Sequence, residues 1–273
     1  MTKQAFVLGW PIEHSRSPAM LNAAFRALGL DATMSSRAVP PERLADAIAE
    51  LRALPALGAS VTIPHKEALL ALADEVSPEA RAIGAANCLE FRDGNVIAHN
   101  TDAPGFADSL GFMRRNAVIL GAGGAARAVA HGLVTGSINA GAGSRAATRV
   151  AVVARRLASW IASHAWSDLP ALLGDADLLV DCTSAGLDPR TDEELADSVP
   201  LGTLPRTATV ATVIYHRPTK LLERAAALGY STVDGRGMLV HQGARALTIW
   251  TGLPAPIEVM SRALDDSLAP SRK

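Results

Sequence analysis

Two ionisable residues stand where they could exchange a proton with a bound substrate. Lys66 lies just past a strand predicted at residues 58–64, and α/β proteins place their sites at the carboxyl ends of strands. Asp102 ends the run Asn100-Thr101-Asp102, directly before a segment patterned like a nucleotide-binding domain. A carboxylate beside a lysine favours the charged ammonium, whereas burial opposes it. Such a lysine can exchange a proton with a substrate hydroxyl as hydride leaves the same carbon.

Both residues also have plainer interpretations. Most lysines are solvated surface groups, and Asp102 could simply cap the helix predicted to run toward Leu110. Ser60 and Thr62 share one face of the strand and offer hydroxyl groups beside Lys66. We interpret the neighbouring His65 as structural, because it should point away from Lys66 if the segment is extended.

A glycine-rich turn near the middle of the chain has the form of a dinucleotide-binding loop. A buried strand at 118–120 leads through Gly121, Gly123 and Gly124 into a helix predicted at 125–133. Backbone N–H groups and a helix N-terminus presented in this way bind a pyrophosphate. The glycine spacing alone is also found in tight strand–helix turns without a ligand. The strand before it and the helix after it favour the nucleotide site.

The residues after the next strand indicate which nucleotide is bound. An NAD site normally places an acidic residue at the end of that strand to bind the ribose hydroxyls. This chain has no Asp or Glu between Asp108 and Asp168, and the strand predicted at 150–154 is followed by Arg155 and Arg156. Two arginines suit the 2′-phosphate of NADP. We therefore expect NADP, with NAD as the alternative cofactor. The alternative interpretation of the two arginines is that they only form the exposed basic start of a helix.

The predicted elements alternate between strands and helices along most of the chain. Before Asp102, strands are expected at 5–9 and 58–64, a hairpin of 88–91 and 95–98 around Asp93-Gly94, and helices at 17–28, 41–54 and 67–73. After it, strands at 118–120, 150–154, 178–182 and 209–214 predict a doubly wound parallel sheet. Residues 238–268 are mostly helical, and the Gly/Ala/Ser-rich stretch 136–147 has no periodicity.

These elements predict an α/β protein of two domains. The first, residues 1–101, is an α/β substrate-binding and catalytic domain completed by the C-terminal helices of 239–273. The second, residues 102–238, is a Rossmann-like dinucleotide-binding domain. At 273 residues the chain is long enough for both domains to bury a core.

Composition excludes several other classes of function. A formal net charge of -1 gives no basic field for nucleic acid. Cys88 and Cys182 lie far apart, so we expect neither a disulfide framework nor a metal site. The N-terminus lacks the pattern of a signal peptide, and no apolar run is long enough to span a membrane. We expect a cytoplasmic protein, either a monomer or a homodimer.

Further polar residues suit a ligand that carries hydroxyl and carboxylate groups. Ser15 and Ser17 flank Arg16 before a predicted helix N-terminus, a place that favours a carboxylate. The alternative is that both serines merely cap the helix. Tyr215 follows a predicted strand directly, and Gln242 lies on the C-terminal helix.

Taken together, the motifs resemble the shikimate dehydrogenase family, from Gly9 to about Leu253. The matching pieces are Gly-Trp-Pro-Ile-Glu-His-Ser-Arg-Ser-Pro at 9–18, Gly-Ala-Ser-Val-Thr-Ile-Pro-His-Lys at 58–66, Ile-Gly-Ala-Ala-Asn at 83–87, Asn-Thr-Asp at 100–102, Gly-Ala-Gly-Gly-Ala-Ala-Arg at 121–127, Tyr215 with Pro218-Thr219, and Asp-Gly-Arg-Gly-Met-Leu-Val-His-Gln at 234–242. The resemblance implies reversible oxidation of shikimate to 3-dehydroshikimate with NADP, in the biosynthesis of chorismate and the aromatic amino acids.

The resemblance also implies a role for each matching residue. Lys66 and Asp102 correspond to the family's catalytic pair. The shikimate contacts correspond to Ser15, Ser17, Ser60, Thr62, Asn87, Tyr215 and Gln242. The residues expected at the nucleotide are Gly121, Ala122, Gly123, Gly124, Ala125 and Ala126 at the pyrophosphate, Arg155 and Arg156 at the 2′-phosphate, and Val213 and Gly235 near the nicotinamide.

Three departures from the family pattern keep alternatives open. Ser60 replaces the usual asparagine, Arg155-Arg156 stands in a degraded Asn-Arg-Thr motif, and the stretch 136–147 lengthens the connection before that motif. A paralogue that prefers quinate or an aminoshikimate, or that uses NAD, is the close alternative. A nucleotide-binding sensor without turnover belongs to a different class. A folate- or glutamyl-type dehydrogenase shares the two-domain plan but does not require the Ser15/Ser17 motif.

Overall fold

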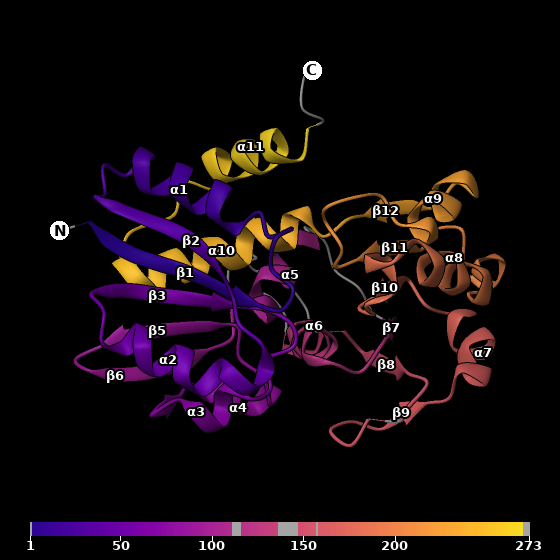
Figure 1. Ribbon diagram of the computed structural model, residues 1–273. Helices are drawn as coiled ribbons and strands as arrows, with labels where there is room; N and C mark the ends of the chain where they lie inside the picture. The colour runs from indigo at the N-terminus through magenta and orange to yellow at the C-terminus, as the bar shows by residue number, and fades with distance from the viewer. Residues whose placement is uncertain (1, 111–115, 136–146, 157, 270–273) are drawn as a thin grey trace. The chain divides into compact units, whose positions relative to one another are not determined.

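The computed structural model describes residues 2–110, 116–135, 147–156 and 158–269 (Figure 1). The chain divides into two compact units, Met1–Gly105 with Leu239–Lys273, and Phe106–Met238. The Gly/Ala/Ser-rich stretch 136–147 lies, apart from Ala147, outside the described residues. Among the helices of the described ranges, none combines the length and the apolar character needed to cross a membrane.

The first unit is built on a six-stranded mixed sheet in the order β2-β1-β3-β5-β6-β4. Its strands are β1 (Lys3–Gly9), β2 (Ala32–Ala38), β3 (Ala56–Val61), β4 (Glu75–Val76), β5 (Cys88–Arg92) and β6 (Asn95–His99). The pairs β1–β2, β1–β3 and β4–β6 are parallel, whereas β3–β5 and β5–β6 are antiparallel. The predicted hairpin is confirmed, and Asp93 (φ 51°) and Gly94 (φ 78°) take the left-handed conformations that its tight turn needs.

Helices cover both faces of this sheet, because its central strand is apolar on both sides. The helices of the unit are α1 (Ser17–Ala27), α2 (Leu44–Arg52), α3 (Leu69–Leu72), α4 (Pro78–Ile83), the start of α5 (Asp102–Leu110), most of α10 (Arg236–Thr251) and α11 (Ile257–Leu268). Ala5 and Val7 of β1 pack with α1, α10 and α11, whereas Phe6 and Leu8 pack with α2 and α3. Alternate residues of β1 therefore belong to two separate cores, one on each face of the sheet.

Two helices predicted from the sequence differ in extent from those observed. The helix expected at 41–54 begins as the 3₁₀ turn η1 (Pro41–Arg43) and ends as α2 at Arg52. The helix expected at 67–73 is α-helical only in α3, so its predicted length was wrong. The physical reason is tighter, 3₁₀-type bonding of the residues before α3: the carbonyls of Glu67 and Ala68 accept the N–H groups of the residues three positions later.

The second unit contains a six-stranded parallel sheet in the order β12-β11-β10-β7-β8-β9. Its strands are β7 (Asn116–Leu120), β8 (Arg149–Val153), β9 (Ser163–His164), β10 (Leu178–Asp181), β11 (Thr209–Thr212) and β12 (Ser231–Val233). Chain order runs outward from β7 in both directions, so the strand order reverses between β7 and β10. This arrangement confirms the predicted doubly wound sheet, in which ligands bind at the carboxyl ends beside the reversal.

The helices of the second unit lie on opposite faces of this sheet (Figure 1). Residues of α5 and α6 (Gly124–Thr135) pack with Ala117 and Ile119, whereas α7 (Leu169–Leu173), α8 (Pro189–Ser198) and α9 (Lys220–Ala227) pack with Val118 and Leu120. Three short 3₁₀ turns, η2 (Trp166–Asp168), η3 (Ala185–Leu187) and η4 (Leu201–Thr203), join these elements.

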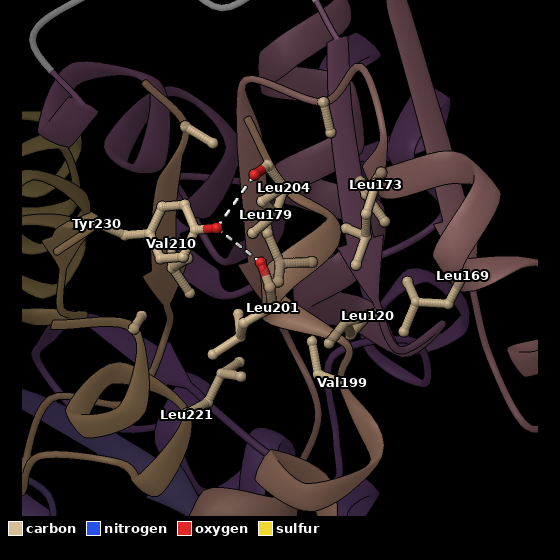
Figure 2. Packing of buried hydrophobic residues seen from close by; sticks show 14 of the residues in the cluster. Leu120, Leu169, Leu173, Leu179, Val199, Leu201, Leu204, Val210, Leu221 and Tyr230 are labelled. Carbon is tan, nitrogen blue, oxygen red and sulfur yellow. Dashed lines mark hydrogen bonds between the residues drawn. The ribbon is translucent and has the colours of Figure 1, made fainter. Parts of the chain in front are cut away.

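A buried tyrosine fixes the connection that leads into β11. The hydroxyl of Tyr230 lies 2.8 Å from the carbonyl oxygen of Leu201 and 3.0 Å from that of Leu204, within the apolar cluster around Val210 and Leu221 (Figure 2). A buried phenol needs such a partner to compensate for its lost hydration. Strand β11, which carries the predicted Val213–Tyr215 segment at its carboxyl end, is therefore anchored at its start.

Candidate active site

Lys66 is placed by the turn that follows β3. The N–H of Thr62 donates to the carbonyl of Leu8 at 2.9 Å, so the parallel pairing with β1 continues one residue past the strand. The buried ring of His65 hydrogen bonds with the carbonyl of Val39 (2.7 Å), which agrees with the structural role expected of it. The carbonyl of Lys66 accepts the N–H of Ala86 at 2.8 Å. The main chain on both sides of Lys66 is therefore held by the body of the unit.

The side chains of Lys66 and Asp102 meet. Lys66 Nζ lies 2.5 Å from Asp102 Oδ2, with the two side chains only 14% and 6% exposed. The interpretation of Asp102 as a simple helix cap is wrong, because the cap is supplied by Asn100, whose Oδ1 accepts the N–H of Ala103 at 3.1 Å. Since Asn100 satisfies the helix end, the Asp102 carboxylate remains available to the lysine. A buried amine held against a carboxylate is suited to proton exchange with a hydroxyl.

Asn87 connects this ion pair to the rest of the site. Its Nδ2 donor lies 3.0 Å from Asp102 Oδ1, 2.9 Å from Thr101 Oγ1 and 3.3 Å from Gln242 Oε1. Its Oδ1 accepts the N–H of Thr101 at 2.6 Å. Four residues from three separate chain segments are thus joined in one buried polar network, which costs free energy unless each member is satisfied.

Gln242 reaches this network because α10 passes very close to α5. A Cβ at Gly105 would lie 2.7 Å from the Gln242 backbone nitrogen, a distance that no side chain tolerates. The Gln242 Nε2 donates to the carbonyl of Leu239 at 2.8 Å, which leaves Oε1 directed at Asn87. Glycine at position 105 is therefore a condition for the placement of Gln242.

The four serine and threonine residues expected at the substrate lie at the start of α1 and at the end of β3. The structure corrects the predicted cap: Ser17 is the first residue of α1, Arg16 takes the capping position without a side-chain bond, and Ser15 Oγ accepts the Ser17 N–H at 3.4 Å. Ser60 is buried within β3, and Thr62 is half-buried just beyond it. None of the hydrogen bonds described for these residues joins them to Lys66 or Asp102.

The glycine-rich turn of the second unit has the shape that a diphosphate needs. Gly121 has φ +99°, its N–H donates to Val153 at 2.9 Å, and a Cβ there would lie 3.2 Å from the Cys182 main chain. A Cβ at Gly123 would meet nothing within 4 Å, so open space lies before the first turn of α6, which begins at Gly124. The open space and the helix N-terminus fit the diphosphate of a dinucleotide. Ala122, Ala125 and Ala126 complete this turn.

The residues expected at the 2′-phosphate and the nicotinamide follow the carboxyl ends of three other strands of the same sheet, β8, β11 and β12. Arg155 and Arg156 are both exposed, just past β8. Val213 follows β11, and a Cβ at Gly235 would lie 2.3 Å from the Val213 carbonyl oxygen. Exposed guanidinium groups at the end of β8 fit a 2′-phosphate, because they are free to form paired hydrogen bonds with its oxygens.

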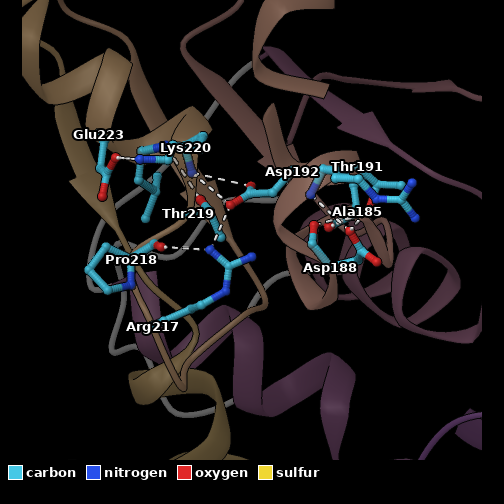
Figure 3. Close-up of polar contacts among 11 residues, drawn as sticks. Ala185, Asp188, Thr191, Asp192, Arg217, Pro218, Thr219, Lys220 and Glu223 are labelled. Carbon is cyan, nitrogen blue, oxygen red and sulfur yellow. Dashed lines mark hydrogen bonds and ion pairs between the residues drawn. The ribbon is translucent and has the colours of Figure 1, made fainter. Parts of the chain in front are cut away.

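Arg217, two residues after Tyr215, forms an ion pair with the buried carboxylate of Asp192 (Figure 3). Asp192 of α8 is completely buried; its carboxylate accepts Arg217 Nη1 at 2.7 Å and the Lys220 N–H at 3.1 Å. Thr219 caps α9 through the N–H of Leu222 (3.4 Å). Tyr215 is half-buried and packs edge-to-face against His216.

Asp181, at the end of β10, has an unusual protonation equilibrium. Burial raises its pKa to about 6, and the charge of Asp192 adds to this, although hydrogen bonds from Thr183 lower it. Its Oδ1 accepts the N–H and hydroxyl of Thr183, at 2.9 and 2.7 Å. Its Oδ2 is buried and has no hydrogen-bond partner among the described residues. Burial likewise raises the pKa of the Cys88 thiol, which makes Cys88 an unreactive core residue.

Sequence reasoning missed three residues that organise these sites. Thr101 and Asn100 lie inside the Asn-Thr-Asp motif, and their position beside Asp102 was the available signal. Asp192 gave no signal, because a charged residue in the first turn of a helix is usually solvated.

Comparison with known proteins identifies the family. The model of the shikimate dehydrogenase substrate-binding domain matches residues 7–89, and that of the shikimate 5'-dehydrogenase C-terminal domain matches residues 235–264. The shikimate dehydrogenase (NADP(+)) of Symbiobacterium thermophilum is 43% identical, with 94% of this chain and 92% of that protein covered.

Solved structures agree with this assignment. The crystal structure of shikimate dehydrogenase from Aquifex aeolicus has a TM-score of 0.84 and 32% identity, covering 96% of this chain and 97% of that one. Shikimate 5-dehydrogenase from Thermus thermophilus, in complex with NADP(H) and shikimate, has a TM-score of 0.81 and 34% identity, covering 97% and 99%. The resemblance inferred from the motifs is confirmed, and the chain belongs to the shikimate dehydrogenase family.

Proposed function

We propose that this protein is an NADP-dependent shikimate dehydrogenase, which interconverts shikimate and 3-dehydroshikimate. The observation that carries the proposal is the buried pair of Lys66 and Asp102, 2.5 Å apart, in a chain 43% identical to an enzyme of that name. The reaction would serve the biosynthesis of chorismate and the aromatic amino acids. We further expect a cytoplasmic enzyme that is a monomer or a homodimer.

Lys66 would move the proton of the reaction. In the oxidation of shikimate, the neutral amine of Lys66 takes the proton of the reacting hydroxyl as the carbon loses hydride. In the reverse direction, the Lys66 ammonium returns that proton to the carbonyl oxygen. NADP⁺, when bound, supplies the hydride acceptor. Asp102 holds the lysine in place, and Asn87 in turn holds Asp102 at 3.0 Å.

The remaining polar residues would bind and orient shikimate. Ser15 and Ser17, at the N-terminal end of α1, suit the carboxylate, because a helix N-terminus favours an anion. Hydroxyl and amide groups suit the ring hydroxyls, and we assign to them Ser60, Thr62, Asn87, Tyr215 and Gln242. Of these, Asn87 and Gln242 already belong to the polar network of the Lys66–Asp102 pair.

The second unit would bind the dinucleotide. We assign the diphosphate to the turn formed by Gly121, Ala122, Gly123, Gly124, Ala125 and Ala126. Arg155 and Arg156 would bind the 2′-phosphate, and Val213 and Gly235 would lie near the nicotinamide. The division of labour that we propose is a substrate-binding first unit and a nucleotide-binding second unit.

A matrix of substrates and cofactors tests the proposal. Purified protein would be mixed with shikimate or quinate and with NADP⁺ or NAD⁺, and nicotinamide absorbance followed. Reduction with shikimate and NADP⁺ is the expected result. Turnover with quinate, or with NAD⁺, would assign the protein to the paralogue class and point to Ser60 or to Arg155 and Arg156. Folded protein that binds nucleotide but turns over neither substrate would be a sensor rather than an enzyme.

A further inference from the structure

One tryptophan outside the predicted site contacts the glycine-rich turn. Trp160 lies beyond β8 and folds back toward α6, where its indole Nε1 donates a hydrogen bond to the carbonyl of Ala122 at 3.0 Å. Its ring packs with the cluster that contains Ala126 and Val129 of α6. The guanidinium carbon of Arg127 lies 5.2 Å from the centre of that ring. The apolar cluster and the Arg127 guanidinium therefore hold the indole ring, while its N–H is hydrogen bonded to the turn.

This hydrogen bond determines the direction of the neighbouring N–H group. In a planar trans peptide, the C=O of one residue and the N–H of the next point in opposite directions. Since the Ala122 carbonyl points at Trp160, the N–H of Gly123 points away from it. Gly123 is exposed, and a Cβ on it would have open space around it. An anion can therefore reach this N–H at the start of α6.

The opposite orientation of this peptide would obstruct nucleotide binding. If the peptide between Ala122 and Gly123 turned over, the turn would present a carbonyl oxygen, and not an N–H, to a negatively charged group. Glycine residues make such a rotation easy, because they have no Cβ to oppose it. A turn that contains Gly121, Gly123 and Gly124 thus needs something outside it to select one orientation.

We propose that Trp160 is a positioning residue for the cofactor, which holds the Ala122–Gly123 peptide so that the Gly123 N–H faces the diphosphate. The inference rests on the proposed function, since it deepens the role of the glycine-rich turn. Arg127 acts through Trp160, because its cation over the indole face holds the ring in the orientation that reaches Ala122.

Three ligands separate this role from a general structural one. NADPH and NADH both carry the diphosphate, whereas adenosine 2′-monophosphate carries the 2′-phosphate without it. Trp160→Phe keeps an aromatic ring but removes the N–H donor. We expect this substitution to weaken the binding of NADPH and of NADH by the same factor, about 5- to 10-fold for one lost neutral hydrogen bond. Binding of adenosine 2′-monophosphate should not change. Dissociation constants would be measured calorimetrically, without turnover.

Two further variants complete the test. Trp160→Leu also removes the contact with Arg127, so its dinucleotide affinities should fall at least as far. Trp166→Phe is the matched control: Trp166 is a half-buried tryptophan of the same unit that packs on the other core cluster. It should leave all three dissociation constants unchanged, and circular dichroism would verify that each variant is folded.

The outcomes distinguish the inference from the function on which it rests. Unchanged NADPH binding in Trp160→Phe would overturn the inference, and so would an equal loss for all three ligands, because that would mark Trp160 as structural only. Wild-type protein that binds neither dinucleotide would remove the proposed function and the inference together. Wild-type binding with a selective loss for the two dinucleotides supports both.

Discussion

Replacing Asp181 by asparagine should remove a pH-dependent cost to the stability of the folded protein. Burial raises the pKa of Asp181 to about 6 in the folded chain, from an ordinary value of 3.8. An acid whose pKa is raised by folding stabilises the folded state below its unfolded pKa and loses that contribution as the pH rises through its folded pKa. The wild-type protein should therefore lose this stability as the pH rises from about 4 to about 6. Above pH 6, the folded state carries the full free-energy cost of the buried carboxylate charge.

The size of the effect follows from the two pKa values. One pKa unit corresponds to about 1.4 kcal/mol, so the charged carboxylate costs the folded state up to about 3 kcal/mol at pH 7. The neutral amide of the Asp181→Asn variant has no charge to bury, and its oxygen can still accept the two hydrogen bonds from Thr183. Its Nδ2 takes the place of the buried, unpartnered Oδ2, and the cost of that donor does not vary with pH. The free energy of unfolding of this variant, relative to wild type, should thus rise with pH between 4 and 7.

Urea unfolding at a series of pH values, followed by circular dichroism, measures this difference. The control is Asp197→Asn on α8, whose side chain is 68% exposed in an ion pair with Arg224. Its effect should be small at every pH, because exposed ion pairs contribute little. A difference between Asp181→Asn and wild type that stays constant from pH 4 to 8, or that falls, would refute the reasoning.

Two other substitutions test how the sites are positioned. Arg217→Ala removes the partner of the buried Asp192 and should raise the KM for shikimate about 10-fold through a loosened Tyr215 segment. Arg224→Ala removes exposed ion pairs between α9 and α8 and should leave this KM unchanged. Equal KM values in both variants would contradict the prediction. Gly105→Ala places a Cβ 2.7 Å from the Gln242 nitrogen and should destabilise the fold by about 1–3 kcal/mol while lowering kcat/KM. Thermal unfolding and initial rates measure the two effects. A fully active, equally stable variant would show that α10 does not need this close approach.

The parts of the fold that could be predicted are those specified by local chemistry. The strand before Gly121 and the helix after it follow from the apolar run and the glycine spacing, and Asp93-Gly94 specifies its hairpin turn. The strand end and the Asn-Thr-Asp run marked Lys66 and Asp102 as candidates, and the family resemblance implied that they form the catalytic pair. The structure places their side chains in contact.

Other features depend on distant parts of the chain and gave no local signal. Strand β2 contains Ser35, Ser36 and Arg37 and is mostly exposed, because it is an edge strand with few core positions. Its pairing with β1 forms only after α1 has returned the chain. The burial of Asp192 similarly depends on Arg217, which is distant in sequence. Local patterns predict elements, whereas such pairings depend on the whole fold.

The most direct test of the central claim is the rate of shikimate oxidation after Lys66→Met, with NADPH affinity measured on the same protein. Methionine keeps the apolar stem of the lysine and removes the group that exchanges the proton. We predict a fall in kcat of at least about 100-fold, the lower end for loss of a general acid–base, with an unchanged dissociation constant for NADPH. A variant that keeps most of the wild-type rate would contradict the assignment of Lys66 and, with it, the mechanism.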